Sequence, residues 1–152
     1  MRLFVRFGFL PVAAAIALAG MGAAAGVAVA SRPAKATTAT NGEGITFTTG
    51  QVERGEESYI ENCVMCHGYN LNDGEFGPPI KGSFFQKKWS GKSVGELYTL
   101  TIMTMPQSNP DSLAPETYAD IMAYMFKANG IAPGDKDLSS DAGALNSVPL
   151  PW

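Results

Sequence analysis

Histidine is almost absent from this sequence, which has one histidine and two cysteines among its 152 residues. All three lie within five positions in the stretch ENCVMCHGY, as Cys63, Cys66 and His67. A structural zinc site needs four protein ligands, and adjacent Cys66 and His67 cannot comfortably share one tetrahedral ion. The shortage of other ligands therefore argues against zinc and leaves a different role for this cluster.

The sequence also lacks an excess of basic residues, with 11 lysines and arginines against 14 aspartates and glutamates and a net charge of −3. A chain of this charge repels phosphate, so we expect no general binding to nucleic acid. One basic run stands out, KGSFFQKKWSGK. It is either a solvated basic face or a docking patch for an acidic partner. Its lysines are Lys81, Lys87, Lys88 and Lys92.

Residues 1–30 have the pattern of a secretory signal peptide. Two arginines precede an apolar run over residues 9–30, and Ala28 and Ala30 form an A-x-A cleavage site. The run is also about long enough to cross a bilayer, so an uncleaved membrane anchor remains an alternative. In both cases we expect the rest of the chain in the periplasm, with membrane contact only if this segment is retained.

The remainder divides into three parts. Residues 31–47 are rich in alanine, threonine and glycine without apolar periodicity, which predicts a flexible linker. Residues 48–130 are expected to form the folded domain, and residues 131–152 an extended C-terminal tail.

No alternating apolar run is long enough to predict a strand, whereas apolar residues recur at helical spacing in three places. Ser93 and Glu96 have capping-box spacing, and Pro115 suits a first helical turn. The sequence thus predicts a small all-α fold with long loops. Three short helices make a poor core unless a large apolar group fills the middle. The predicted helices cover about residues 51–63, 93–103 and 115–128.

The C-x-x-C-H spacing is the attachment motif of c-type haem. Cys63 and Cys66 would form thioethers to the porphyrin, and His67 would bind the iron, because the sequence has no other imidazole. A thioredoxin-like redox pair is disfavoured, because a helix rather than a strand is predicted before the motif. A simple disulfide across two residues would constrain the unfolded chain very little.

The second axial ligand must be sought among the methionines, the remaining soft ligands. Met105 precedes a proline, so it should be extended rather than helical and able to point away from its helix. We favour Met105, with Met103 or no protein ligand as alternatives. Met122 and Met125 lie at core spacing and are expected to pack.

From about residue 48 to 130 the sequence resembles class I c-type cytochromes. The resemblance rests on a Gly-x3-aromatic-x3-Cys-x2-Cys-His pattern beginning at Gly55, on ADIMAY, on GPPI and on TMP. It implies a small cytochrome c fold around one covalent haem c and its iron. It further implies that the first and third helices cross near Gly55, that the Pro78 carbonyl accepts a hydrogen bond from His67, and that Met105 is the distal ligand.

Within that class the sequence is most similar to small cytochromes that accompany quinoprotein dehydrogenases. The resemblance implies a carrier of single electrons from a dehydrogenase to a terminal oxidase or another cytochrome, with no catalytic residues of its own. A tightly bound subunit of an oxidoreductase complex is the main alternative. A haem sensor or a peroxidase-like enzyme is less favoured, since no second histidine exists to serve as a distal acid–base group.

Overall fold

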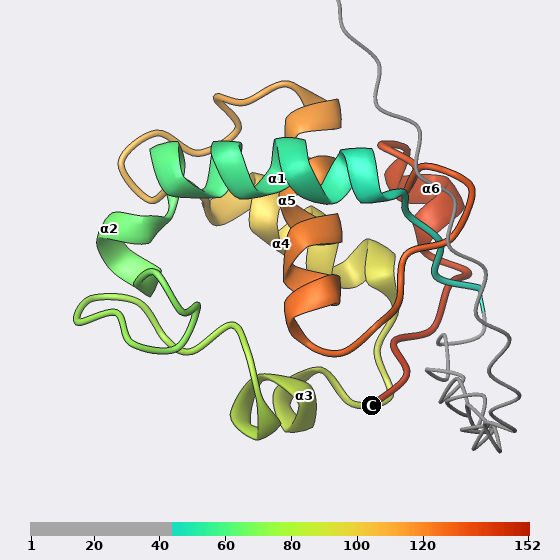
Figure 1. Ribbon diagram of the computed structural model, residues 1–152, viewed down its shortest axis with the longest axis horizontal. Helices are drawn as coiled ribbons and strands as arrows, with labels where there is room; N and C mark the ends of the chain where they lie inside the picture. The colour runs from blue at the N-terminus through green and yellow to red at the C-terminus, as the bar shows by residue number, and fades with distance from the viewer. Residues whose placement is uncertain (1–43) are drawn as a thin grey trace, which may run out of the picture. The chain divides into compact units, whose positions relative to one another are not determined.

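The computed structural model describes residues 44–152 (Figure 1). Within this range the only strand-like feature is an isolated antiparallel bridge between Ser93 and Pro149, so the all-α prediction is confirmed. The signal peptide and most of the linker predicted for residues 1–47 lie outside the described residues. The helices are α1 (Thr49–Asn62), α2 (Val64–His67), α3 (Ser83–Trp89), α4 (Val94–Thr104), α5 (Pro115–Ala128) and α6 (Ala142–Leu145).

Helices α1, α4 and α5 correspond to the three predicted from the sequence, and their ends show why. The Thr48 hydroxyl accepts a hydrogen bond from the backbone N–H of Gln51 at the start of α1. Ser93 and Glu96 form the full capping box of α4. Helix α5 begins at Pro115 without a side-chain cap, because its N-cap residue is an alanine.

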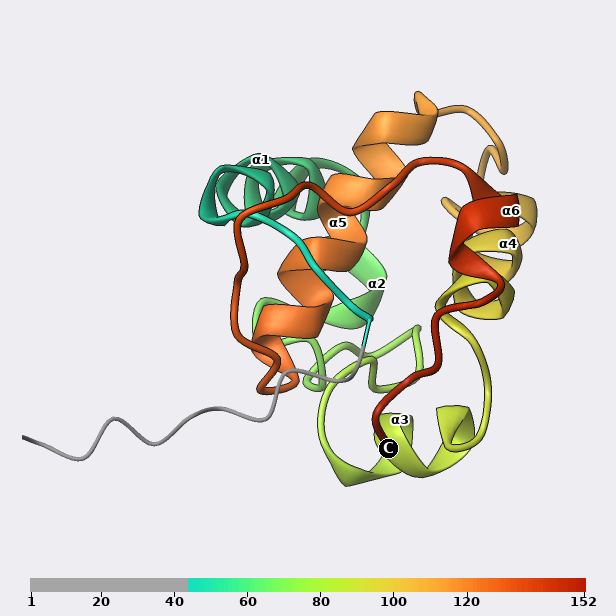
Figure 2. The same cartoon turned by 90° about the vertical axis from the view of Figure 1, so that its right-hand side faces the viewer.

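Helices α1 and α5 cross (Figures 1 and 2). The crossing lies at Gly55, as the resemblance to class I c-type cytochromes implies. A Cβ atom at Gly55 would collide with the backbone carbonyl of Asp120. Only glycine permits this approach, which brings the rings of Tyr59 and Tyr124 to a centroid distance of 5.4 Å. The crossing fixes α1, and with it the residues that follow it, against the main core helix.

An ion pair reinforces this crossing. Arg54 Nε lies 2.7 Å from Asp120 Oδ2, and its Nη2 donates to Asp120 Oδ1 at 3.0 Å. Asp120 is only 7% exposed, and a buried carboxylate without a partner would be strongly destabilising. The bidentate interaction with Arg54 therefore compensates for the burial of the Asp120 carboxylate at the helix crossing.

Three short helices were not predicted from the sequence. Helix α2 is a single turn that carries the C-x-x-C-H motif, α6 is a single turn in the tail, and α3 occupies the basic run. In α3, Phe85 and Trp89 are four residues apart and both buried. This i, i+4 pair could have indicated α3, but it lies within a segment otherwise dense in glycine and lysine.

The packed domain extends beyond its predicted limits at both ends. Phe47 is fully buried and Ile45 is 5% exposed, so the assignment of these residues to a flexible linker is wrong. The tail, residues 131–152, passes the start of α1, forms α6 beside α4 and ends near α3 (Figure 2). The side-chain amide of Gln51 both donates to the carbonyl and accepts from the N–H of Leu138, which fixes the tail against α1.

Among the described helices, none combines the length and the apolar character that crossing a bilayer requires.

Candidate functional site

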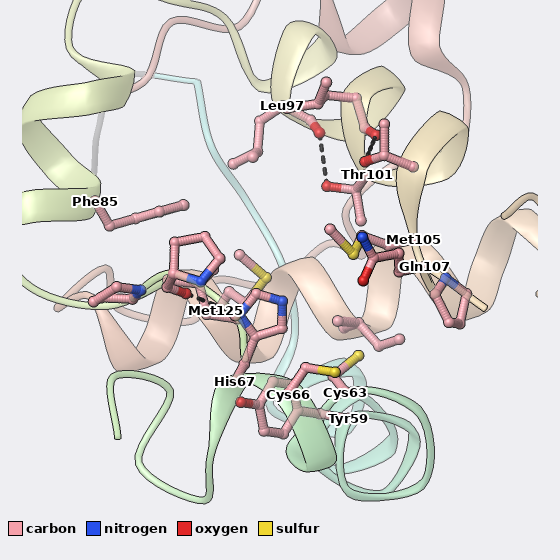
Figure 3. A pocket seen from close by; sticks show the side chains of 18 of the residues that line it. Tyr59, Cys63, Cys66, His67, Phe85, Leu97, Thr101, Met105, Gln107 and Met125 are labelled. Atoms are coloured by element: carbon pink, nitrogen blue, oxygen red, sulfur yellow. Dashed lines mark hydrogen bonds between the residues drawn. The ribbon is translucent and has the colours of Figure 1, made fainter. Parts of the chain in front are cut away.

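Helix α2 presents both thiols and the imidazole from one turn of backbone. Cys63 joins α1 to α2, with its N–H donating to the Tyr59 carbonyl at 2.8 Å. The His67 N–H donates to the Cys63 carbonyl at 2.9 Å, which closes the turn. His67 is 7% exposed, and its ring points into a cavity alongside Cys63 and Cys66 (Figure 3).

The orientation of the His67 ring is set by the loop that follows the motif. His67 Nδ1 lies 2.9 Å from the carbonyl oxygen of Pro78. A carbonyl can only accept, so Nδ1 carries a proton, and in the neutral imidazole Nε2 is then the nitrogen with the free lone pair. The Gly77 N–H donates to the Cys66 carbonyl at 2.9 Å, and this contact holds the loop close to the ring.

Only glycine fits at position 77, beside the imidazole of His67. A Cβ atom at Gly77 would lie 2.7 Å from His67 Nδ1 and 2.8 Å from Cε1. Any larger residue at position 77 must therefore displace the ring or the loop.

A buried tyrosine supports the same side of the cavity. The Tyr59 hydroxyl donates to the carbonyl of Gly68 at 2.6 Å, immediately after the histidine. Burial raises the pKa of Tyr59 well above its usual value, so its hydroxyl remains a donor at any physiological pH. The hydrogen bond links the end of α2 to the helix that leads into it.

Met105 enters the cavity from another part of the chain. It is the C-cap residue of α4, with extended backbone angles (φ −130°, ψ 149°). Figure 3 shows it near the end of α4, on a different side of the cavity from His67. The Tyr118 hydroxyl of α5 donates to its backbone carbonyl at 2.7 Å. The two potential axial ligands therefore come from different elements and reach the same space.

The other methionines differ in their placement. Met103 is 68% exposed and does not line this cavity. Met122 is fully buried in the core, as expected for packing. Met125 is 4% exposed and lines the cavity as well, which the sequence did not reveal.

The cavity has a volume of about 1070 Å³, including its open mouth. Cofactor clefts are mainly apolar, with a few convergent polar groups. This one has apolar walls, two thiols, one imidazole and the thioethers of Met105 and Met125. Its lining comes from α1, α2, the loop of residues 76–80, α3, α4, the segment of residues 105–107 and α5.

The state of the thiols argues against a redox dithiol. Neither cysteine is in a disulfide, and burial raises the pKa of Cys63 to about 11, with a smaller contribution from Cys66. A nucleophilic thiol needs the opposite shift, because the thiolate is the reactive form. Within residues 44–152, no three His, Cys, Asp or Glu side chains are grouped to hold a metal ion by themselves.

The geometry agrees with the comparisons to known proteins. The family described as cytochrome C oxidase, cbb3-type, subunit III, matches residues 50–125, which is half of the chain. The chain belongs to this family of c-type cytochromes. A curated protein described as cytochrome c-553-like, from Synechocystis sp., is 29% identical over 76 residues, which cover 50% of this chain and 68% of that protein. No solved structure matches the chain significantly.

Cytochromes of this family carry covalently bound haem c with its iron, and Cys63, Cys66 and His67 have the required C-x-x-C-H spacing. The residues present fit the group. The imidazole keeps an unprotonated Nε2 inside a large apolar cavity, and a thioether is available from a separate element. The cytochrome is accordingly an electron-transfer protein.

All five residues singled out from the sequence line this one cavity: Cys63, Cys66, His67, Pro78 and Met105. The sequence did not identify the walls. Phe85 and Trp89 of α3 contribute apolar surface, and Leu97 and Thr101 contribute the inner face of α4. The i, i+4 spacing of Phe85 and Trp89 could have located the first wall. The inner face of α4 could not have been recognised, because a helix face that lines a cofactor cavity has the same apolar spacing as one that faces the core.

Proposed function

We propose that this cytochrome is a periplasmic monohaem electron carrier, which accepts single electrons from a dehydrogenase and passes them to a terminal oxidase or another cytochrome. The observation that carries the proposal is the arrangement of one cavity. An oriented imidazole, two thiols and a methionine from a separate element all face it.

In this proposal Cys63 and Cys66 attach the haem, and His67 Nε2 and the Met105 thioether bind its iron. The bound haem supplies one-electron chemistry. The protein's own residues hold it and exclude water. The Pro78 carbonyl keeps the His67 proton on Nδ1, a contact that also makes an imidazole a better ligand. Met/His ligation raises the reduction potential, which suits a carrier between a dehydrogenase and an oxidase.

The comparison of Met105 with Met103 tests the ligand assignment. We expect Met105→Ala to retain covalent haem but to lose the far-red charge-transfer band of ferric Met-ligated haem. Met103→Ala should keep the band, because that side chain is 68% exposed and outside the cavity. Met125→Ala serves as a second control, since Met125 lines the cavity from α5. Haem that is extracted by acid acetone would overturn the covalent attachment itself.

We propose that the partner docks on the lysines beside the cavity. Lys88 lines the cavity mouth, and Lys88 and Lys92 share a surface groove with the exposed side chains of Leu100 and Met103. In a chain of net charge −3, four of the 11 basic residues lie in this one run. Glu96 lines the same groove and lies 3.7 Å from Lys92 Nζ, which leaves Lys88, among the described residues, as the unpaired charge there. A partly apolar surface with a net positive charge favours an acidic partner and faster association.

Charge reversal tests the docking surface. With an acidic electron acceptor, Lys88→Glu should slow the second-order rate at low salt, and the difference should shrink as ionic strength rises. Lys127→Glu, an exposed lysine in the last turn of α5, is the matched control. Equal rates for the two variants would contradict docking at this surface.

A tightly bound subunit of an oxidoreductase complex is the second candidate, because the matching family is described as a subunit of an oxidase. Size-exclusion chromatography of the native protein distinguishes the two, since a free carrier elutes as a monomer. Export is tested by intact mass, which we expect to correspond to cleavage after Ala30.

A further inference from the structure

We propose that Trp152 is a positioning residue, which holds the α3 wall of the haem cavity closed and so keeps water from the haem. This inference rests on the proposed function, since it concerns the environment of the same haem. It assigns a role to a segment beyond residue 125, where the family match ends.

Trp152 contacts the wall from behind. Its ring meets that of Phe85 in an edge-on arrangement, with centroids 5.5 Å apart and an interplanar angle of 64°. On its other side it lies 6.3 Å from the ring of Phe126, a fully buried residue of α5. Phe85 lines the haem cavity and is 2% exposed. Trp152 therefore fills the space between a wall residue and the fixed core.

Helix α3 has little other support from helices. In the described part of the chain, extensive helix–helix packing joins α1 with α5 and α2, and α4 with α5 and α6, but does not include α3. The start of α3 is held by Asn129, whose side-chain oxygen accepts from the Gly82 N–H at 3.0 Å. The side-chain amide of Gln86 adds a hydrogen bond to the Asn129 carbonyl at 3.3 Å. On the buried face, Phe85 contacts Trp89 of the same helix and Trp152, so of these two aromatic contacts only the one with Trp152 joins α3 to another segment.

The tail can fix Trp152 because its own backbone is anchored two residues earlier. The Leu150 N–H donates to the Lys92 carbonyl at 2.9 Å, and the Val94 N–H donates to the Val148 carbonyl at 2.8 Å. Leu150 itself is 5% exposed. The tail end is thus bound to the segment that joins α3 to α4, next to the wall that it supports.

Loosening Phe85 would admit water to the cavity. Ferric haem carries one more positive charge than ferrous haem, and a polar environment stabilises the more charged form. Solvent exposure and the apolar shell are among the factors that set the potential of such centres. An intact wall therefore favours the ferrous state, and loss of Trp152 should lower the midpoint potential.

Four holoprotein variants test the proposal. We expect Trp152→Ala to lower the midpoint potential and to speed amide hydrogen exchange in residues 83–89, while the far-red band of the Met-ligated haem remains. Pro151→Ala, an exposed neighbour in the same tail, should change neither property. Trp152→Phe keeps an aromatic ring and should restore much of the wild-type potential. Trp152→Leu is the milder alternative if the alanine variant does not fold.

Each outcome is decisive. A potential of Trp152→Ala equal to that of Pro151→Ala overturns the proposal, even if exchange in α3 accelerates, because the tail would then support the fold alone. If the wild-type protein lacks covalent haem or the far-red band, the proposed function fails instead. That failure is seen before any variant is made, so the two cannot be confused.

Discussion

The side of the cavity that carries His67 is built from one short stretch of chain, whereas the opposite side is assembled from distant segments. On the histidine side, the hydroxyl of Tyr59, the turn of α2 and the carbonyl of Pro78 lie within twenty residues and are joined by hydrogen bonds. On the methionine side, Met105 is held by Tyr118 of α5, and the wall of α3 is supported by the tail.

This difference teaches which side should tolerate change. Local hydrogen bonds and two adjacent covalent attachment points would preserve the histidine side even when one contact is lost. The methionine side depends on single contacts between elements, so removing any one of them should weaken the binding of Met105 to the iron.

The largest effect is expected at Gly77, where the histidine side has no room to adjust. Gly77→Ala places a methyl group 2.7 Å from His67 Nδ1 and should displace the ring from Pro78. Overpacking of this kind costs about 1–3 kcal/mol, which thermal unfolding measures, and the ligand field should change in the haem spectrum.

Gly50→Ala is the matched control for that variant. Its new methyl group would meet nothing closer than 3.6 Å, and alanine is the better helix former. It should leave the spectrum unchanged and stabilise the protein slightly. A Gly77→Ala spectrum identical to that of the wild type would show that the histidine side is more adaptable than its packing indicates.

A smaller effect is expected from two tyrosines that donate to equivalent carbonyls on the two sides. Tyr118→Phe removes the hydrogen bond to the Met105 carbonyl, worth about 1 kcal/mol. Exogenous imidazole competes with the methionine for ferric iron, so its affinity should rise about fivefold. Tyr59→Phe removes the bond to the Gly68 carbonyl and should leave imidazole affinity unchanged, although it also lowers stability. Equal affinities in the two variants would remove the proposed asymmetry.

The smallest effect concerns pH and the start of α4. The hydrogen bond from the Ser93 N–H lowers the pKa of Glu96. A lowered pKa means that the stabilisation is present above the ordinary glutamate pKa and is lost as pH falls through the folded value. The melting temperature of Glu96→Gln should therefore fall less between neutral pH and pH about 3 than that of the wild type.

The parts that could be predicted from the sequence are those fixed by local chemistry. Helices α1, α4 and α5 can be predicted from the apolar residues at helical spacing and from residues suited to their first turns. Gly55, at the helix crossing, belongs to the Gly-x3-aromatic-x3-Cys-x2-Cys-His pattern. The histidine side of the cavity follows from five consecutive positions. The position of Met105 at the cavity could be expected because a proline follows it and favours an extended backbone there; its role as ligand remains a proposal.

The remaining parts depend on partners far along the chain. Helix α3 has no side-chain cap at Gly82, and its position comes from Asn129 and Trp152. Met125 has the spacing of a core residue, and a stripe that faces a cofactor has the same pattern as one that faces another helix. The tail has no apolar periodicity from which its structure could be predicted. It is held instead by hydrogen bonds to distant residues, such as that between Gln51 and Leu138, 87 positions apart.

The anchoring of the tail also bears on how the protein reaches its folded state. The hydrogen bond from the Thr46 hydroxyl to the Lys136 carbonyl spans 90 positions, among the largest separations within the described domain. Small helical proteins fold fast when their contacts are local, and contacts between remote positions slow them. The wall behind the haem depends on Trp152, which lies far along the chain from the attachment motif. Closing the cavity therefore requires contacts between remote positions and should be a late and slow step of folding.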